Sequence, residues 1–186
     1  MNKSRFLWRL CVLSTPIALI LGGCESVREL VLSIPGADQF INQPLPSIPA
    51  QTPNIAEMEV AIRQQINKIR LENNLQPLEN NERLAQVARQ YSQRMAQENF
   101  FSHTGPEGDT PAQRVRDGGI MYLMVGENLF RSSNISDPVP VAVQGWMESS
   151  GHRENILRSV FAETGVGVWR EGNQYYITQM FLRSLL

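Results

Sequence analysis

Apolar residues recur at helical spacing where the folded part of this chain begins. Apolar positions 55, 58, 62, 66 and 69 fall on one face of a helix, so the pattern predicts a helix from Ile55 to about Asn73. Asn54 is followed three residues later by Glu57, directly after Pro53, which is a capping-box-like start. We therefore expect this helix to begin at Asn54 and to bury one face.

A second helix is predicted after Asn80 or Asn81, either of which is a suitable cap. Its apolar positions 84, 87, 88, 91 and 95 again follow helical spacing. Two shorter helices are indicated where a cap residue is followed by proline, at positions 110–111 and 137–138. Glycines at 118 and 119 should end the first of these, and the second should end near Met147.

The pattern becomes strand-like toward the C-terminus. Residues 164–170 and 174–182 are rich in β-branched and aromatic side chains, and Glu171-Gly172-Asn173 forms a short turn between them. This pattern predicts a β-hairpin. Another strand is expected around residues 122–125. Helices followed by a terminal hairpin predict helices packed on an antiparallel sheet.

The first 23 residues have the pattern of a signal peptide. Lys3, Arg5 and Arg9 form a positive n-region, and a mostly apolar stretch over residues 10–21 follows. Pro16 interrupts this stretch, which is shorter than the roughly 20 apolar residues of a membrane-spanning helix. The Leu-Gly-Gly-Cys sequence that ends at Cys24 resembles the lipobox of bacterial lipoproteins. The resemblance implies cleavage before Cys24 and a thioether link from its sulfur to diacylglycerol, which carries fatty acids such as palmitate; the alternative is an ordinary secretory signal.

The organisation that follows is a lipid-anchored tether and one folded domain. Prolines at 35, 44, 46, 49 and 53 favour extended conformations over packing, so residues 24–53 are interpreted as a tether. Residues 54–186 have an ordinary length for a single domain. We expect this domain to be a monomer in the cell envelope of a bacterium, held to the membrane through Cys24.

Charge and cysteine content argue against a nucleic-acid-binding protein and against a disulfide-stabilised domain. Removal of residues 1–23 leaves 14 basic against 18 acidic residues, so the mature chain is mildly acidic. Nucleic acid is therefore not expected as a partner. Cys11 leaves with the signal peptide and Cys24 is acylated, so no disulfide is expected in the domain.

The candidate chemistry gathers around the two histidines of the chain, His103 and His152, each of which is expected in a polar loop marked by glycine. His103 ends the sequence FFSH, GEN stands at residues 126–128, and His152 lies within WMESSGHRENIL at residues 146–157. Together with LQPL at 75–78, GVGV at 165–168 and TQ at 178–179, these segments resemble the CAP superfamily of cysteine-rich secretory, antigen 5 and pathogenesis-related 1 proteins, in its bacterial SCP-like branch. The resemblance implies a three-layer α-β-α sandwich with a central, largely antiparallel sheet.

The resemblance also implies a cavity lined by two histidines and two glutamates. By motif these are His103, Glu127 and His152, with Glu148 as the fourth member, although the eukaryotic spacing from the tryptophan falls on Ser149. In some relatives this group binds a divalent metal, and two imidazoles plus a carboxylate suit zinc. A hydrogen-bonded cluster that only orders the cavity is the alternative.

Two functions follow from these residues. The first is a binding module for a lipid, glycan or peptide, because no dedicated nucleophile stands out. The second is a metal-dependent hydrolase in which Glu148 or Glu154 acts as general base. Ser149 and Ser150 precede a short helix and lack a nucleophile-elbow pattern, so a serine hydrolase is not expected. Three arginines, at 114, 116 and 153, are expected to pair with carboxylates on the surface.

Overall fold

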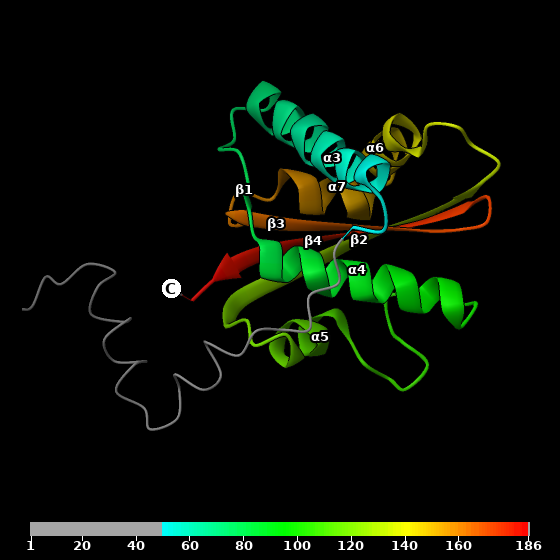
Figure 1. Ribbon diagram of the computed structural model, residues 1–186. Coiled ribbons are helices and arrows are strands. Elements are labelled where there is room, and N and C mark those ends of the chain that lie inside the picture. The colour runs from blue at the N-terminus through cyan, green and yellow to red at the C-terminus, as the bar shows by residue number, and fades with distance from the viewer. Residues whose placement is uncertain (1–49, 186) are drawn as a thin grey trace, which may run out of the picture.

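The computed structural model describes residues 50–185 of the chain. A central sheet lies between two helical layers, with α3, α6 and α7 on one face and α4 and α5 on the other (Figure 1). The elements in chain order are α3 (Pro53–Glu72), β1 (Glu79–Asn80), α4 (Glu82–Gln97), α5 (Pro111–Asp117), β2 (Tyr122–Ser133), α6 (Pro138–Glu148), α7 (Ser150–Leu157), β3 (Glu163–Glu171) and β4 (Gln174–Ser184). The predicted α/β sandwich is confirmed.

The sheet is mixed and mostly antiparallel, in the order β1-β3-β4-β2. β1 pairs in parallel with the start of β3, while β4 is antiparallel to both β3 and β2. The predicted terminal hairpin is confirmed: Glu171 pairs with Gln174, and Gly172 between them has a φ of 60°, a left-handed conformation that suits glycine.

The prediction that Asn54 caps α3 is wrong by two residues. Thr52 is the N-cap, and its Oγ1 accepts a hydrogen bond of 3.3 Å from the backbone N–H of Ile55. Pro53 then occupies the first helical position, where its missing N–H costs nothing. The other predicted caps are confirmed: Asn81 caps α4, and the cap-proline pairs at 110–111 and 137–138 start α5 and α6.

Strand β2 is much longer than the predicted segment 122–125. It continues through Glu127 and Asn128, which are polar yet buried. Buried polar side chains require partners, which sequence periodicity does not reveal. Because side chains alternate along a strand, Glu127 faces the α4–α5 layer and Asn128 faces α7.

The GVGV sequence at 165–168 lets α4 pack directly on the sheet. A Cβ on Gly167 would lie 2.1 Å from the backbone nitrogen of Arg89, and one on Gly165 would lie 2.3 Å from that of Ala85. Any larger residue would push α4 away. A buried ion pair also joins the helices, since Nη2 of Arg89 lies 2.7 Å from Oε2 of Glu59 on α3.

The segment just before α3 contacts the far end of the sheet. The side-chain amide of Gln51 donates to the carbonyl of Arg170 and accepts from its N–H, both at 3.0 Å. The predicted signal peptide, Cys24 and most of the predicted tether lie outside the described residues. Across residues 50–185, no helix combines the length and apolar character needed to span a membrane.

Candidate functional site

His103 lies in the loop between α4 and α5, as predicted, and its side chain is 54% exposed. The loop closes on itself, because the N–H of Gly105 donates to the carbonyl of Asp109 over 3.0 Å. A Cβ on Gly105 would lie 2.1 Å from Oδ1 of Asp109, so only glycine fits this close turn. The loop that carries His103 is therefore restrained by its own contacts.

Glu127 supports His103 from the strand below. Its side chain is only 1% exposed, and Oε1 lies 2.8 Å from Nδ1 of His103. The second oxygen, Oε2, accepts a hydrogen bond of 2.8 Å from Nη2 of Arg114. Both carboxylate oxygens therefore have partners, and one side of the imidazole ring is held in place.

Arg114 is the centre of this cluster rather than a surface charge, so the prediction of a solvated ion pair is wrong for this residue. Its side chain is 10% exposed. Nη1 donates to the backbone carbonyl and to Oδ2 of Asp109, both at 3.0 Å, and the guanidinium lies 3.4 Å from the ring centre of Tyr91. The residue binds the loop, α5 and β2 together because one planar group can donate in several directions.

The cluster changes the ionisation of two of its members. Burial, together with nearby carboxylates, raises the pKa of Tyr91 to about 12, so its hydroxyl stays neutral and donates to the carbonyl of Ser102. Burial opposes ionisation of Asp109, but hydrogen bonds from Arg114 and Arg94 outweigh it and lower the pKa of that carboxyl. Asp109 is therefore a stable anion between two guanidinium groups.

His152 lies in the first turn of α7, not in a loop as predicted. The ring centres of His103 and His152 are 6.4 Å apart, so the structure brings the two remote histidines together. Burial first, and then the neighbouring His103, lower the pKa of His152 below its usual value of 6.5. A mostly neutral imidazole therefore stands beside the supported one at neutral pH.

Two asparagines fix α7 against β2. Nδ2 of Asn155 donates to the carbonyl of Glu127 over 3.1 Å and to Oδ1 of Asn128 over 2.9 Å. Nδ2 of Asn128 in turn donates to the carbonyl of His152 over 3.1 Å. These bonds explain why GEN and GHREN occur together: each supplies a site residue and the asparagine that positions the other segment.

Glu148 stands apart from this group. It is exposed at the end of α6, where it accepts a hydrogen bond of 2.8 Å from Gln144. It hydrogen-bonds to neither histidine nor to Glu127. Glu154, the other carboxylate considered as a base, pairs with Arg158 one turn along. Of the four residues that the resemblance implies, the structure brings His103, Glu127 and His152 together and leaves Glu148 apart.

The arrangement does not fit a metal held by all three of these residues together. Nδ1 of His103 is bonded directly to Glu127, whose other oxygen faces the guanidinium of Arg114. Among residues 50–185 no group of three or more His, Cys, Asp or Glu side chains is arranged to hold a metal ion.

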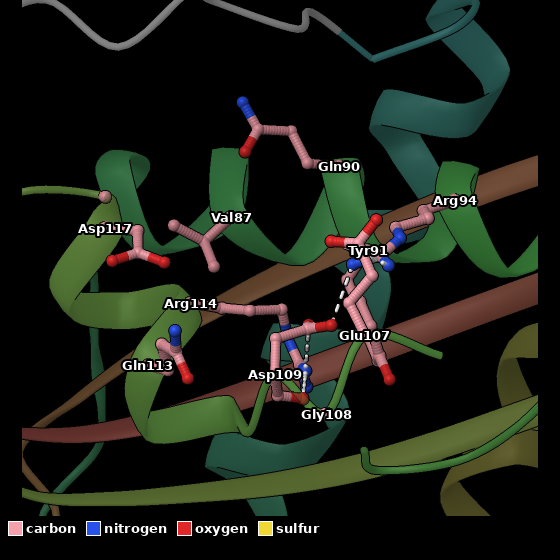
Figure 2. Close-up of a pocket in the computed structure, with 11 residues that line it drawn as sticks. Val87, Gln90, Tyr91, Arg94, Glu107, Gly108, Asp109, Gln113, Arg114 and Asp117 are labelled. Atoms are coloured by element: carbon pink, nitrogen blue, oxygen red, sulfur yellow. Dashed lines mark hydrogen bonds and ion pairs between the residues drawn. The ribbon is translucent and has the colours of Figure 1, made fainter. Parts of the chain in front are cut away.

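A hollow of about 400 Å³ lies on the other side of Arg114, between α4, the loop and α5 (Figure 2). Val87 and Tyr91 lie on the α4 side, and Asp109 and Arg114 separate the hollow from Glu127. Neither histidine lines it. Sequence periodicity did not indicate this feature, since its lining comes from three separate segments.

Comparison with known proteins assigns the chain to a family. The sequence profile of the cysteine-rich secretory protein family, CAP, matches residues 63–181. YkwD, an uncharacterized protein of Bacillus subtilis, is 33% identical over 129 residues, which cover 69% of this chain and 48% of YkwD. YlbC, an uncharacterized membrane protein of Bacillus subtilis, is 36% identical over 117 residues, 63% of this chain and 32% of YlbC.

Solved structures agree with the sequence matches. An extracellular protein of Bacillus anthracis with an SCP domain superposes with a TM-score of 0.63 at 32% identity, over 77% of this chain and 45% of that one. An outer surface protein of Borrelia burgdorferi has the same fold, with a TM-score of 0.63 at 22% identity over 74% of this chain and 96% of that one. The chain thus spans about half, or less, of its Bacillus relatives. On its sequence and its fold together, this chain belongs to the cysteine-rich secretory protein (CAP) family.

Proposed function

We propose that this chain is an exported, lipid-anchored binding domain of the bacterial cell envelope. The observation that carries the proposal is the pairing of a half-exposed His103 with a buried carboxylate and guanidinium. A side chain that is 54% exposed normally keeps its rotamer freedom, yet here Glu127, which is itself paired with Arg114, holds one ring nitrogen. Such preorganisation reduces the entropy cost of binding a ligand.

The proposed ligand contacts the domain through a polar group. Among the described residues, nothing hydrogen-bonds to Nε2 of His103 or to either ring nitrogen of His152. Two imidazoles 6.4 Å apart can donate to, or accept from, a hydroxyl, amide, phosphate or carboxylate. This chemistry suits the polar part of an envelope lipid, a glycan or a peptide, the three ligand classes that the sequence suggests.

The proposal favours binding over hydrolysis for a structural reason. No hydroxyl side chain in residues 50–185 hydrogen-bonds to His103 or His152, so the histidines activate no serine or threonine there. Glu127 has both oxygens occupied, which makes it a positioning group rather than a general base.

The proposed export and membrane anchoring are supported by the relatives and by the N-terminal sequence, and not by the histidine site. The Bacillus anthracis relative is an extracellular protein, and YlbC is a membrane protein. Together with the signal-peptide pattern and the lipobox-like sequence at Cys24, these relatives support secretion and acylation. A proline-rich tether would then hold the binding site some distance from the membrane surface.

A capture experiment tests the proposed function. The purified chain is incubated with an extract of envelope lipids, glycans and peptides, and retained molecules are identified by mass spectrometry. We expect a retained species that is reduced about tenfold by His103→Ala or Glu127→Gln, as expected when a charged or preorganised hydrogen bond is lost. Glu148→Gln is the matched control and should retain it fully. Equal retention by all variants would contradict the proposal.

A further inference from the structure

The rim of the hollow between α4 and α5 is rich in unused hydrogen-bonding groups. The side chains of Gln90, Gln113 and Asp117 have no hydrogen-bond partner among the described residues, and all three line the hollow. Glu107 is 87% exposed, and only one nitrogen of Arg94 approaches it, at 3.8 Å. All four line the hollow together with Val87 (Figure 2).

The wall of the hollow contains a buried donor that lacks an acceptor. The side chain of Arg114 is nine-tenths buried, and its Nε has no hydrogen-bond partner within residues 50–185. Its two terminal nitrogens are used by Asp109, His103 and Glu127. A buried donor without an acceptor is costly, but this nitrogen is covered from solvent, so Arg114 forms a polar wall of the hollow and the ligand contacts are made by the rim.

The chemistry of the lining excludes three classes of ligand. Anions would be repelled by Glu107 and Asp117, while the arginines of the wall are already neutralised by Asp109 and Glu127. An apolar ligand would remove the polar rim from water without replacing its hydrogen bonds. An ammonium group can donate to the carboxylates but has no lone pair to accept from the side-chain amides of Gln90 and Gln113.

Hydroxyl groups satisfy every part of the lining, because each can donate to a carboxylate and accept from a guanidinium or an amide. We propose that this hollow is a second binding site and that it takes a neutral sugar. Its volume of about 400 Å³ lies within the range of small-molecule sites, roughly 300–1,000 Å³. Gln90 on α4 and Gln113 and Asp117 on α5 all line the hollow, so the sugar ring lies between the two helices.

This second site does not depend on the proposed role of the histidines, although both sites share Arg114. His103 and His152 do not line the hollow. Replacing His103 by alanine should therefore change the Kd for the sugar by no more than about twofold, because no contact with the sugar is lost. Failure of the histidine site and failure of the sugar site are thus separate outcomes.

Calorimetric titration of the purified full chain with N-acetylglucosamine, glucose and mannose tests the proposal. At least one of these sugars should bind, and Asp117→Asn and Gln113→Ala should each weaken it about tenfold, as expected for a lost hydrogen bond to a ligand. Both side chains are exposed, so the variants should fold normally. Glu57→Gln, which removes an exposed charge from α3 in the opposite layer, is the control and should bind like the unmodified chain.

Inorganic phosphate and putrescine serve as the anionic and cationic probes. Neither should bind at the hollow or compete with the sugar. The proposal is overturned if none of the three sugars binds, if Asp117→Asn and Gln113→Ala bind the sugar as well as Glu57→Gln does, or if phosphate or putrescine binds in its place.

Discussion

Arg114 and Glu127 form a buried ion pair with a separation of 2.8 Å between Nη2 and Oε2, and their side chains are 10% and 1% exposed. The pair joins α5 to the middle of β2 and leaves the other carboxylate oxygen facing His103. Its geometry therefore decides how one imidazole of the candidate site is held.

Replacing Glu127 with glutamine should destabilise the domain. The substitution keeps the size of the side chain but leaves the Arg114 charge with only Asp109 as a counterion. Removing one partner of a buried pair costs about 3 kcal/mol of unfolding free energy. Urea denaturation measures it, and Glu148→Gln on the exposed end of α6 should change stability by less than about 0.5 kcal/mol. Equal effects of the two variants would show that the pair is not what stabilises β2.

Stability should fall between pH 7.5 and pH 5.5 through His152. Burial and His103 lower its pKa in the folded state below 6.5, so the unfolded chain takes up the proton first as the pH falls. The folded state loses stability through that window. Denaturation of His152→Gln at both pH values should show a smaller difference than the unmodified chain. His103→Ala should raise the pKa of His152, and an unchanged value would show that the two rings do not interact.

Sequence patterns predicted the helices and the terminal hairpin for identifiable reasons, whereas the proximity of the two histidines was implied only by the family resemblance. Helical periodicity and short-range caps such as Asn81 are local, so they can be read directly. Arg114 could not be assigned, because its burial depends on Glu127, thirteen residues away and on another element. The only local signal was the cap at Thr110, which starts α5 and places Arg114 one turn later.

The errors in the predictions have the same physical origin. β2 was cut short at residue 125 because Glu127 and Asn128 look like loop residues until their tertiary partners are known. His152 was placed in a loop because glycine and serine around it resemble a turn, although Asn155 fixes this segment as a helix on β2. In both cases tertiary contacts, and not the local propensity of the residues, determine the secondary structure.

Replacing Cys24 with serine should prevent lipid attachment. The proposed acylation and cleavage both require that thiol, so the variant should appear in the soluble fraction or remain as uncleaved precursor. Metabolic labelling with a radioactive fatty acid measures it. Cys11→Ser is the matched control and should label normally, because Cys11 lies within the proposed signal peptide. Undiminished label in Cys24→Ser would place any lipid elsewhere.

Zinc should have little effect on the domain, because only the two imidazoles have ring nitrogens available to it, and two ligands are fewer than the three or four of a stable zinc site. Binding by His103, Glu127 and His152 would require the direct His103–Glu127 bond to break beside the Arg114 charge. We expect equimolar zinc to shift the melting temperature by less than about 2 °C at pH 7.5, which corresponds to under about 1 kcal/mol. A larger rise at pH 7.5 than at pH 5.5, abolished by His103→Ala and by His152→Ala, would establish a metal site instead.

The central claim is that the two histidines together form a ligand site. The chain contains only two histidines, so its imidazole proton–carbon NMR spectrum has two signals that mutation can assign. Titration with the species captured from envelope extract should move both signals along one saturable curve, and Glu127→Gln should weaken that curve about tenfold while Glu148→Gln leaves it unchanged. Saturable binding that moves neither imidazole signal would contradict the account.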